Sequence, residues 1–209
     1  MNLANKKNTK YPEERAIWNT PENAFDWSWP KVPRHQFLLE KDKAFDLNGE
    51  SLMIPLDLSE VLKTSYLATT PSILARYIRI NNKKNVYHTL NASGEIYYVL
   101  NGTGSSKNED VTIAWSRGDV FCFPGGKQTI HSSLEENSIL FQVTNEPLLS
   151  FEQLSPNFDV NSNILPSHWP YERTKAFLEE RYKRPKTKET SGVAVLFSTE
   201  ETLPSRNTI

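Results

Sequence analysis

The sequence predicts an all-β fold, an antiparallel barrel or sandwich of the jelly-roll type. Short segments rich in β-branched and aromatic residues follow one another through the central third of the chain, and such segments are typical of strands. Turns that contain Gly, Asn or Pro separate them, and no helical pattern interrupts them, as in a sheet that winds back on itself. The predicted strands are residues 72–80, 96–100, 111–115, 120–123, 128–131 and 138–144.

The residues before the predicted barrel divide into two parts. Residues 1–16 are polar and rich in Lys and Asn, so we expect a disordered N-terminus that cannot bury enough surface to become ordered. Residues 17–65 are predicted to form an arm that aromatic side chains anchor to the barrel. Prolines prevent a regular helix or strand over 17–45, whereas residues 56–63 predict a short helix.

The predicted barrel, residues 66–150, is followed by a C-terminal extension, residues 151–185. Residues 171–184 predict a helix, because apolar side chains recur at helical spacing and Pro185 ends the pattern. Residues 186–209 are predicted to begin as a linker and to continue, in the segment VAVLF, as one further strand.

The charge balance excludes a protein whose main partner is a polyanion. The chain has 24 basic and 25 acidic side chains and a net charge of −1, whereas nucleic-acid-binding domains carry a basic face. No apolar segment is long enough to span a membrane, so we expect neither a nucleic acid nor a membrane as partner. Cys122 is the single cysteine, and the chain cannot form an internal disulfide, which favours a reducing, cytoplasmic location.

Two stretches carry regularly spaced polar and glycine residues. Glu95 is followed after six residues by Gly102, and Gly118 is followed after five residues by the turn 124–126. These spacings resemble the two motifs of the cupin superfamily. The resemblance implies a cupin fold, which is a jelly-roll barrel or double-stranded β-helix, with metal ligands that face the interior of the barrel near its mouth.

The resemblance identifies His88, Glu95 and His131 as the candidate metal ligands. Leu90 stands at the second position of the His-x-His pair that the first motif contains. In the second motif, Thr129 stands at the histidine position, and His131 follows two residues later. Residues i and i+2 of a strand share a face, so His131 is still expected to face the interior.

The resemblance extends to one particular group of cupins. Residues 68–80, 115–126 and 140–149 resemble the N-terminal barrel of gentisate 1,2-dioxygenases and related bicupins. This implies Fe(II), or else Mn or Zn, held by two imidazoles and one carboxylate, a small aromatic hydroxy acid as substrate, and a homodimer. Residues 193–209 resemble the beginning of the second barrel, so we interpret the chain as a shortened member that retains the first barrel.

Three functions remain open from the sequence alone. The first is the ring-cleaving dioxygenase that the resemblance implies. The second is a metal-free barrel that binds a small molecule or a partner chain, which Leu90 favours because leucine cannot donate a lone pair to a metal. The third is a metal-dependent isomerase or lyase in which Glu95 or Tyr97 is the catalytic acid or base.

Several other residues have simpler interpretations. Arg76 and Arg79 are expected to form surface salt bridges rather than to bind a substrate carboxylate. Tyr97 and Tyr98 point to opposite faces of one strand, so one of them should be buried. Cys122 is expected to be a small buried hydrophobic residue rather than a nucleophile.

Overall fold

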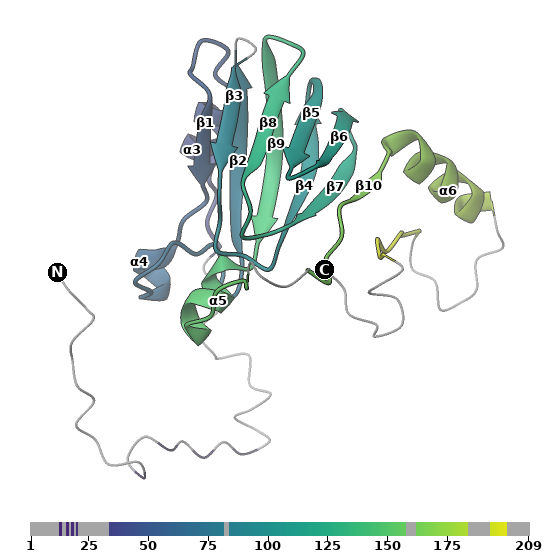
Figure 1. Ribbon diagram of the computed structural model, residues 1–209. Helices are drawn as coiled ribbons and strands as arrows, with labels where there is room; N and C mark the ends of the chain where they lie inside the picture. Colours follow the sequence, from purple (N-terminus) through teal and green to yellow (C-terminus); the bar gives the residue numbers. More distant parts are fainter. Residues whose placement is uncertain are drawn as a thin grey trace.

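The computed structural model of the protein describes residues 34–81, 84–157, 162–183 and 193–199, together with residues 13, 16, 18 and 20. Within these ranges, two antiparallel sheets pack face to face as a barrel (Figure 1). The larger sheet consists of β1 (Leu52–Pro55), β2 (Leu74–Asn81), β9 (Asn137–Thr144), β4 (Gly94–Asn101), β7 (Val120–Pro124) and β10 (Ser167–Trp169), in that order. The smaller sheet consists of β3 (Asn85–His88), β8 (Thr129–Ser133), β5 (Thr103–Asn108) and β6 (Val111–Ser116). This arrangement confirms the all-β jelly-roll prediction.

The hydrophobic core lies between the two sheets. Alternate residues of each strand face inward, and the larger sheet contributes Tyr97, Phe121 and Leu140 among others, while Ile113 and Trp115 come from the smaller sheet. Tyr97 is fully buried and Tyr98 is 43% exposed, which confirms that they point to opposite faces. Cys122 is also fully buried, as predicted for a small hydrophobic residue.

Strand β5 was not predicted, because its sequence, TGSSKN, contains no large apolar residue. Its inward positions are nevertheless buried, and they are occupied by Gly104, Ser106 and Asn108. Gly104 is required there, because a Cβ atom would lie 2.2 Å from the carbonyl oxygen of Ser132. A strand of small and polar residues thus fits a crowded, hydrogen-bonded part of the interior, where the usual β-propensity pattern does not apply.

Four helices of the described ranges lie on the periphery of the barrel (Figure 1): α3 (Leu38–Phe45), α4 (Ser59–Leu62), α5 (Glu146–Glu152) and α6 (Tyr171–Lys183). The prediction that residues 17–45 contain no regular helix is wrong, because α3 lies within this range. The prolines of the predicted arm that come before β1 all precede α3 in the sequence, so none of them interrupts the helix. Helices α4 and α6 agree with the predicted ones. None of the helices in the described ranges is long and apolar enough to cross a membrane.

Arg79 connects helix α3 to the barrel. Its guanidinium group donates hydrogen bonds to the backbone oxygens of Lys43, Asp46 and Glu50, and the residue is only 6% exposed. The predicted surface salt bridge of Arg79 is therefore wrong. Backbone oxygens at the end of α3 and just after it therefore accept the hydrogen bonds of Arg79 that a carboxylate would otherwise accept.

The strand predicted within VAVLF is also wrong, because residues 193–199 form neither helix nor strand. Instead, Phe197 packs against Trp169 of β10, with the ring centroids 5.2 Å apart. Most of the predicted disordered segment 1–16, and all of residues 186–192 and 200–209, lie outside the described residues.

Asp119 ties the C-terminal extension to the barrel. Its Oδ1 accepts a hydrogen bond from the backbone N–H of Tyr171, at 2.7 Å, where α6 begins. Its Oδ2 accepts from the N–H of Ser116 at 2.9 Å and lies 3.0 Å from Nε2 of His168 in β10. One buried carboxylate therefore joins the β6–β7 turn, β10 and α6.

We expect Asp119→Ala to loosen β10 and α6 while the sheets stay folded. The loss leaves several donors without their acceptor and should cost about 1–2 kcal/mol locally. Hydrogen exchange followed by mass spectrometry should show faster exchange in residues 167–183. The exposed Asp110→Ala is the matched control, and unchanged exchange of residues 167–183 in Asp119→Ala would contradict the assignment.

Candidate metal centre in the barrel

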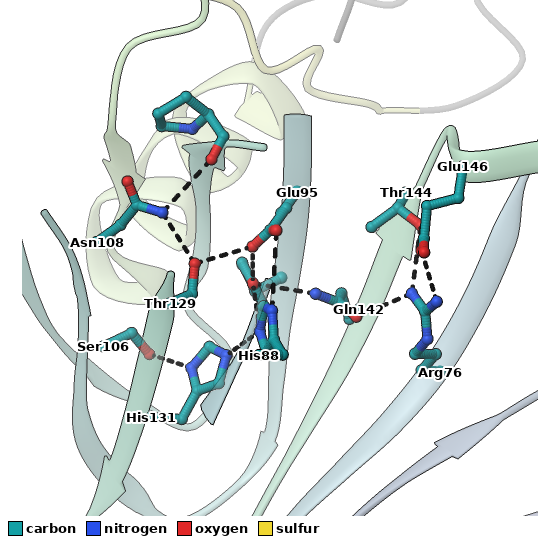
Figure 2. Close-up of polar contacts among 12 residues, drawn as sticks. Arg76, His88, Glu95, Ser106, Asn108, Thr129, His131, Gln142, Thr144 and Glu146 are labelled. Atoms are coloured by element: carbon teal, nitrogen blue, oxygen red, sulfur yellow. Dashed lines mark hydrogen bonds and ion pairs between the residues drawn. The ribbon is translucent and has the colours of Figure 1, made fainter. Parts of the chain in front are cut away.

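The sequence-predicted site residues meet inside the barrel (Figure 2). His88 ends β3 and pairs in register with Thr129 at the start of β8. His131 lies two residues further along β8, so the two histidines share the inner face of the smaller sheet. Glu95 and Tyr97 occupy alternate inward positions of β4 in the opposite sheet. His131, Glu95 and Tyr97 are fully buried, and His88 is nearly so.

The two imidazole rings converge through the same nitrogen. Nε2 of His88 lies 3.0 Å from Nε2 of His131. The hydroxyl oxygen of Tyr97 lies 3.3 Å from Nε2 of His88 and accepts a hydrogen bond from Nε2 of Gln142 at 3.0 Å. Three atoms that could bind a metal ion, from β3, β8 and β4, thus surround one point in the barrel.

The carboxylate of Glu95 faces the other side of the His88 ring. Oε2 accepts hydrogen bonds from the hydroxyls of Tyr97 and Thr129, the latter at 3.1 Å. Oε1 lies 3.8 Å from Nδ1 of His88, and neither of these two buried atoms has a hydrogen-bond partner in the described part of the chain. The structure therefore brings Glu95 into the cluster, but not to the point where the two Nε2 atoms meet.

A second group of polar side chains surrounds this cluster, and the sequence analysis did not assign it to the site. Arg76 lies inside the barrel at 5% exposure, and its Nη2 is 2.5 Å from Oε2 of Glu146. Its Nη1 donates to Oε1 of Gln142, and to the hydroxyl of Thr144, at 3.3 Å each. The predicted salt bridge of Arg76 is therefore present, but its placement at the surface is wrong, because Arg76 is buried and its partner Glu146 is only 18% exposed.

One signal in the sequence could have revealed these residues. In β9, Gln142 and Thr144 alternate in phase with the core residue Leu140, and in β2 Arg76 alternates in phase with Leu74 and Ile78. Polar residues in phase with a buried apolar series face the core, where they must be paired.

Burial sets the protonation of the cluster. It lowers the pKa of His88 to about 4, with a further contribution from the charge of Arg76, and holds the pKa of His131 well below its usual value. Burial raises the pKa of Glu95 to about 7, against the opposing effect of the hydrogen bonds from Tyr97 and Thr129. Burial also raises the pKa of Tyr97 well above its usual value. At neutral pH both imidazoles are therefore uncharged, as metal coordination requires.

The histidine pair fits two ligands of one transition-metal ion. Ligand atoms at about 2.1 Å from an ion lie about 3 Å apart at right-angled positions of an octahedral site, which matches the distance between the two Nε2 atoms. The unpartnered Oε1 of Glu95 is a further oxygen donor close by. In the described ranges, however, no group of three His, Cys, Asp or Glu side chains is arranged to hold an ion, because Glu95 approaches His88 at Nδ1.

Two loops close to the cluster in the sequence, residues 90–93 after His88 and residues 125–126 before Thr129, hydrogen-bond to each other. The backbone N–H of Gly126 donates to the oxygen of Leu90, and that of Gly125 donates to the oxygen of Ser93, both at 3.0 Å. Gly125 admits no side chain, because a Cβ atom would lie 1.9 Å from the oxygen of Ala92. A groove of about 710 Å³ lies along the outer side of the second loop. Asn108 lines this groove and donates to Thr129 at 2.9 Å, which links the groove to Glu95.

Comparisons with known proteins agree with this architecture. No protein-family model matches the chain. A 5-aminosalicylate 1,2-dioxygenase from Comamonas sp is 27% identical over 81 residues, which is 39% of this chain and 22% of the dioxygenase. A mutant of the salicylate 1,2-dioxygenase from Pseudoaminobacter salicylatoxidans superposes with a TM-score of 0.55 at 15% identity, covering 71% of this chain and 53% of that one. A cupin superfamily protein from Desulfitobacterium hafniense matches with a TM-score of 0.36 at 15% identity, over 46% of this chain and 79% of its own.

The chain thus spans about a fifth of the curated relative and about half of the superposed dioxygenase. The matches confirm the resemblance predicted from the motifs, and the superposition is one of fold. The protein has the cupin fold, and its barrel resembles that of a salicylate 1,2-dioxygenase.

Proposed function

We propose that the protein is a metal-dependent cupin oxidoreductase, an Fe(II) dioxygenase that acts on a small aromatic hydroxy acid. The observation that carries the proposal is the convergence of two uncharged imidazoles, with their Nε2 atoms 3.0 Å apart, inside a closed barrel. The resemblance to dioxygenases that act on salicylates supports the choice of substrate class.

His88 and His131 would hold the ion through their Nε2 atoms. Oε1 of Glu95, which has no hydrogen-bond partner among the described residues, lies on the Nδ1 side of His88, so Glu95 would become the third ligand only if its side chain turned towards the ion. The chemistry that such an ion supplies is the activation of dioxygen beside a hydroxy acid that binds through two oxygens. The residues of the chain then have three tasks. The barrel excludes water, Tyr97 holds a proton next to the histidine pair, and Arg76 places a fixed positive charge behind Gln142.

A substrate needs a route into this closed interior. Backbone hydrogen bonds join residues 90–93 to residues 125–126, and residues 91 and 93 also hydrogen-bond to Leu154 and Asn145. A substrate that enters here would have to break some of these hydrogen bonds. The groove beside Asn108 is also lined by Ser93 and Gly125, which belong to these two loops. Entry from that groove would bring a hydroxy acid first to Thr129 and Glu95.

Metal content tests the proposal directly. Protein purified without chelator and loaded anaerobically with Fe(II) should contain close to one equivalent of iron by elemental analysis. His131→Ala should lose it, because one of the two converging nitrogens is removed. His35→Ala is the matched control, since His35 is exposed and lies outside the barrel, and it should retain the metal.

Oxygen uptake with gentisate, salicylate and 5-aminosalicylate then distinguishes a dioxygenase from a metal-dependent isomerase or lyase. Iron bound by wild type and by His35→Ala, with oxygen consumed, supports the proposal. Wild-type protein that takes up no iron, manganese or zinc would contradict it.

The alternative of a metal-free binding barrel is favoured by one observation. Oε2 of Glu95 already accepts two hydrogen bonds from the protein, and Leu90 and Thr129 occupy motif positions that the resemblance assigns to metal ligands. Wild-type protein without metal affinity, but with aromatic acids bound in calorimetry, is the result that would support this alternative.

A further inference from the structure

Ser106 makes a short hydrogen bond to the ring nitrogen of His131 that faces away from His88. Ser106 occupies an inward position in the middle of β5, directly opposite His131 in the register with β8. Its Oγ lies 2.6 Å from Nδ1 of His131, and Nε1 of Trp115 donates to the same Oγ at 2.8 Å. Ser106 and His131 are fully buried, and Trp115 is 2% exposed.

The direction of these hydrogen bonds follows from the groups that can only donate. An indole N–H is a donor and never an acceptor, so Trp115 uses one lone pair of the Ser106 oxygen. The structure gives this hydroxyl one other partner, Nδ1 of His131. If the hydroxyl proton pointed elsewhere, a buried donor would remain unsatisfied at a cost of about 1–3 kcal/mol. Ser106 therefore donates to Nδ1 in the ligand-free protein.

This assignment determines the tautomer of His131. Because Nδ1 accepts, the single ring proton of the neutral imidazole lies on Nε2. That proton is donated to Nε2 of His88, 3.0 Å away. The proton of His88 then lies on Nδ1, which faces the unpartnered Oε1 of Glu95 at 3.8 Å. The hydrogen bonds thus run in one direction, from Trp115 through Ser106 and His131 to His88, and Nδ1 of His88 faces Oε1 of Glu95 without a hydrogen bond.

We infer that Ser106, oriented by Trp115, is the positioning residue that determines which nitrogen of His131 carries the proton. The part of this inference that concerns metal rests on the proposed function. When Nε2 of His131 binds an ion, its proton must move to Nδ1. The Ser106 oxygen can then accept a hydrogen bond from Nδ1–H through its second lone pair, because Trp115 uses only the first. Rotation of the Ser106 hydroxyl allows both the metal-free and the metal-bound state. In the metal-bound state the serine proton has no acceptor.

The test combines four variants with two measurements. Ser106→Ala removes the hydroxyl, Ser106→Thr retains it, and Trp115→Phe removes only the indole N–H while keeping an aromatic ring. Ser105→Ala is the matched control, since Ser105 precedes it on the same strand and points to the other face. One measurement is ¹⁵N NMR of the histidine side chains in metal-free protein, and the other is titration with Co(II) followed by its visible absorption.

In metal-free wild type, we expect the ¹⁵N shifts of His131 to show a protonated Nε2 and an unprotonated Nδ1. Ser106→Ala should give averaged shifts, and its Co(II) affinity should fall by about 10–100-fold, the usual effect of removing a group that orients a metal-binding histidine. Ser106→Thr should restore both properties, and Trp115→Phe should give a smaller change in the same direction. Melting curves separate these effects from a general loss of folding.

Two results would overturn the inference. One is a wild-type spectrum with the His131 proton on Nδ1. The other is a Ser106→Ala protein whose ¹⁵N shifts and Co(II) affinity equal those of Ser105→Ala. If wild type binds no Co(II), the proposed function fails while the NMR measurement still decides the role of Ser106.

Discussion

Replacing Arg76 with methionine is expected to lower the free energy of unfolding by about 3 kcal/mol, because removal of one partner of a buried ion pair leaves the other charge without compensation. The Glu146 carboxylate, 2.5 Å from the guanidinium and 18% exposed, would keep only the hydrogen bond from Thr144. Oε1 of Gln142 would lose its donor as well. Urea-induced unfolding of wild type and variant measures the difference.

A double-mutant cycle shows whether the loss comes from the ion pair. Arg76→Met combined with Glu146→Gln should cost less than the sum of the single changes by about 1–3 kcal/mol, since the second change removes the uncompensated charge. Glu109→Gln is the control for an exposed pair, because Glu109 lies 3.0 Å from Lys127 with 55% of its side chain exposed. That change should cost less than about 1 kcal/mol. Additive losses for Arg76 and Glu146 would show that the contact does not act as a pair.

Replacing Glu95 with glutamine is expected to change how stability depends on pH. The folded-state pKa of Glu95 is about 7, against 4.5 for an ordinary glutamate. Between these values the folded protein keeps a proton that the unfolded chain releases. The contribution of Glu95 to stability is therefore fully present below pH 4.5 and is lost as the pH rises to 7. A shift of this size corresponds to about 3 kcal/mol.

The two histidines act in the opposite direction. The pKa of His88 falls from 6.5 to about 4 on folding, so its contribution is present above pH 6.5 and is lost as the pH falls towards 4. Both histidines remain in the Glu95→Gln variant. The difference in unfolding free energy between variant and wild type should therefore rise in favour of the variant from pH 4.5 to 7, and should then level off.

The measurement is a series of urea unfolding curves at pH 4.5–8 on protein dialysed against a chelator. The exposed Glu60→Gln controls for the loss of one acidic side chain. A difference between Glu95→Gln and wild type that stays constant across this range would mean that Glu95 ionises equally easily in the folded and unfolded states.

Much of the barrel could be predicted because strand patterns are local. In β4 and β9 the β-branched and aromatic residues lie within a few neighbouring positions, and they correctly placed Tyr97 and Tyr98 on opposite faces of one strand. The structure shows that Tyr97 is the buried one. Helix α6 was predicted for the same reason. Strand β5 was not, because its inward residues are small and polar and are selected by contacts with β6 and β8 rather than by their own propensity.

The candidate site was predictable as a list of residues but not as a geometry. The motif resemblance named His88, Glu95 and His131, and all three lie in one buried cluster. It could not show that Glu95 approaches Nδ1 of His88 while His131 approaches Nε2, because ring orientation depends on the packing and hydrogen bonds of the folded barrel.

The sequence by itself determined the fold class and the position of many strands along the chain, because those depend on local residue type and spacing, and its resemblance to the cupin motifs named the candidate ligands. Only the tertiary structure decided that Arg76 lies inside against Glu146 and that Ser106 meets His131. These partners are 70 and 25 positions apart in the sequence, and antiparallel register brings them together. Register is set by pairing across whole sheets, and no short stretch of sequence specifies it alone.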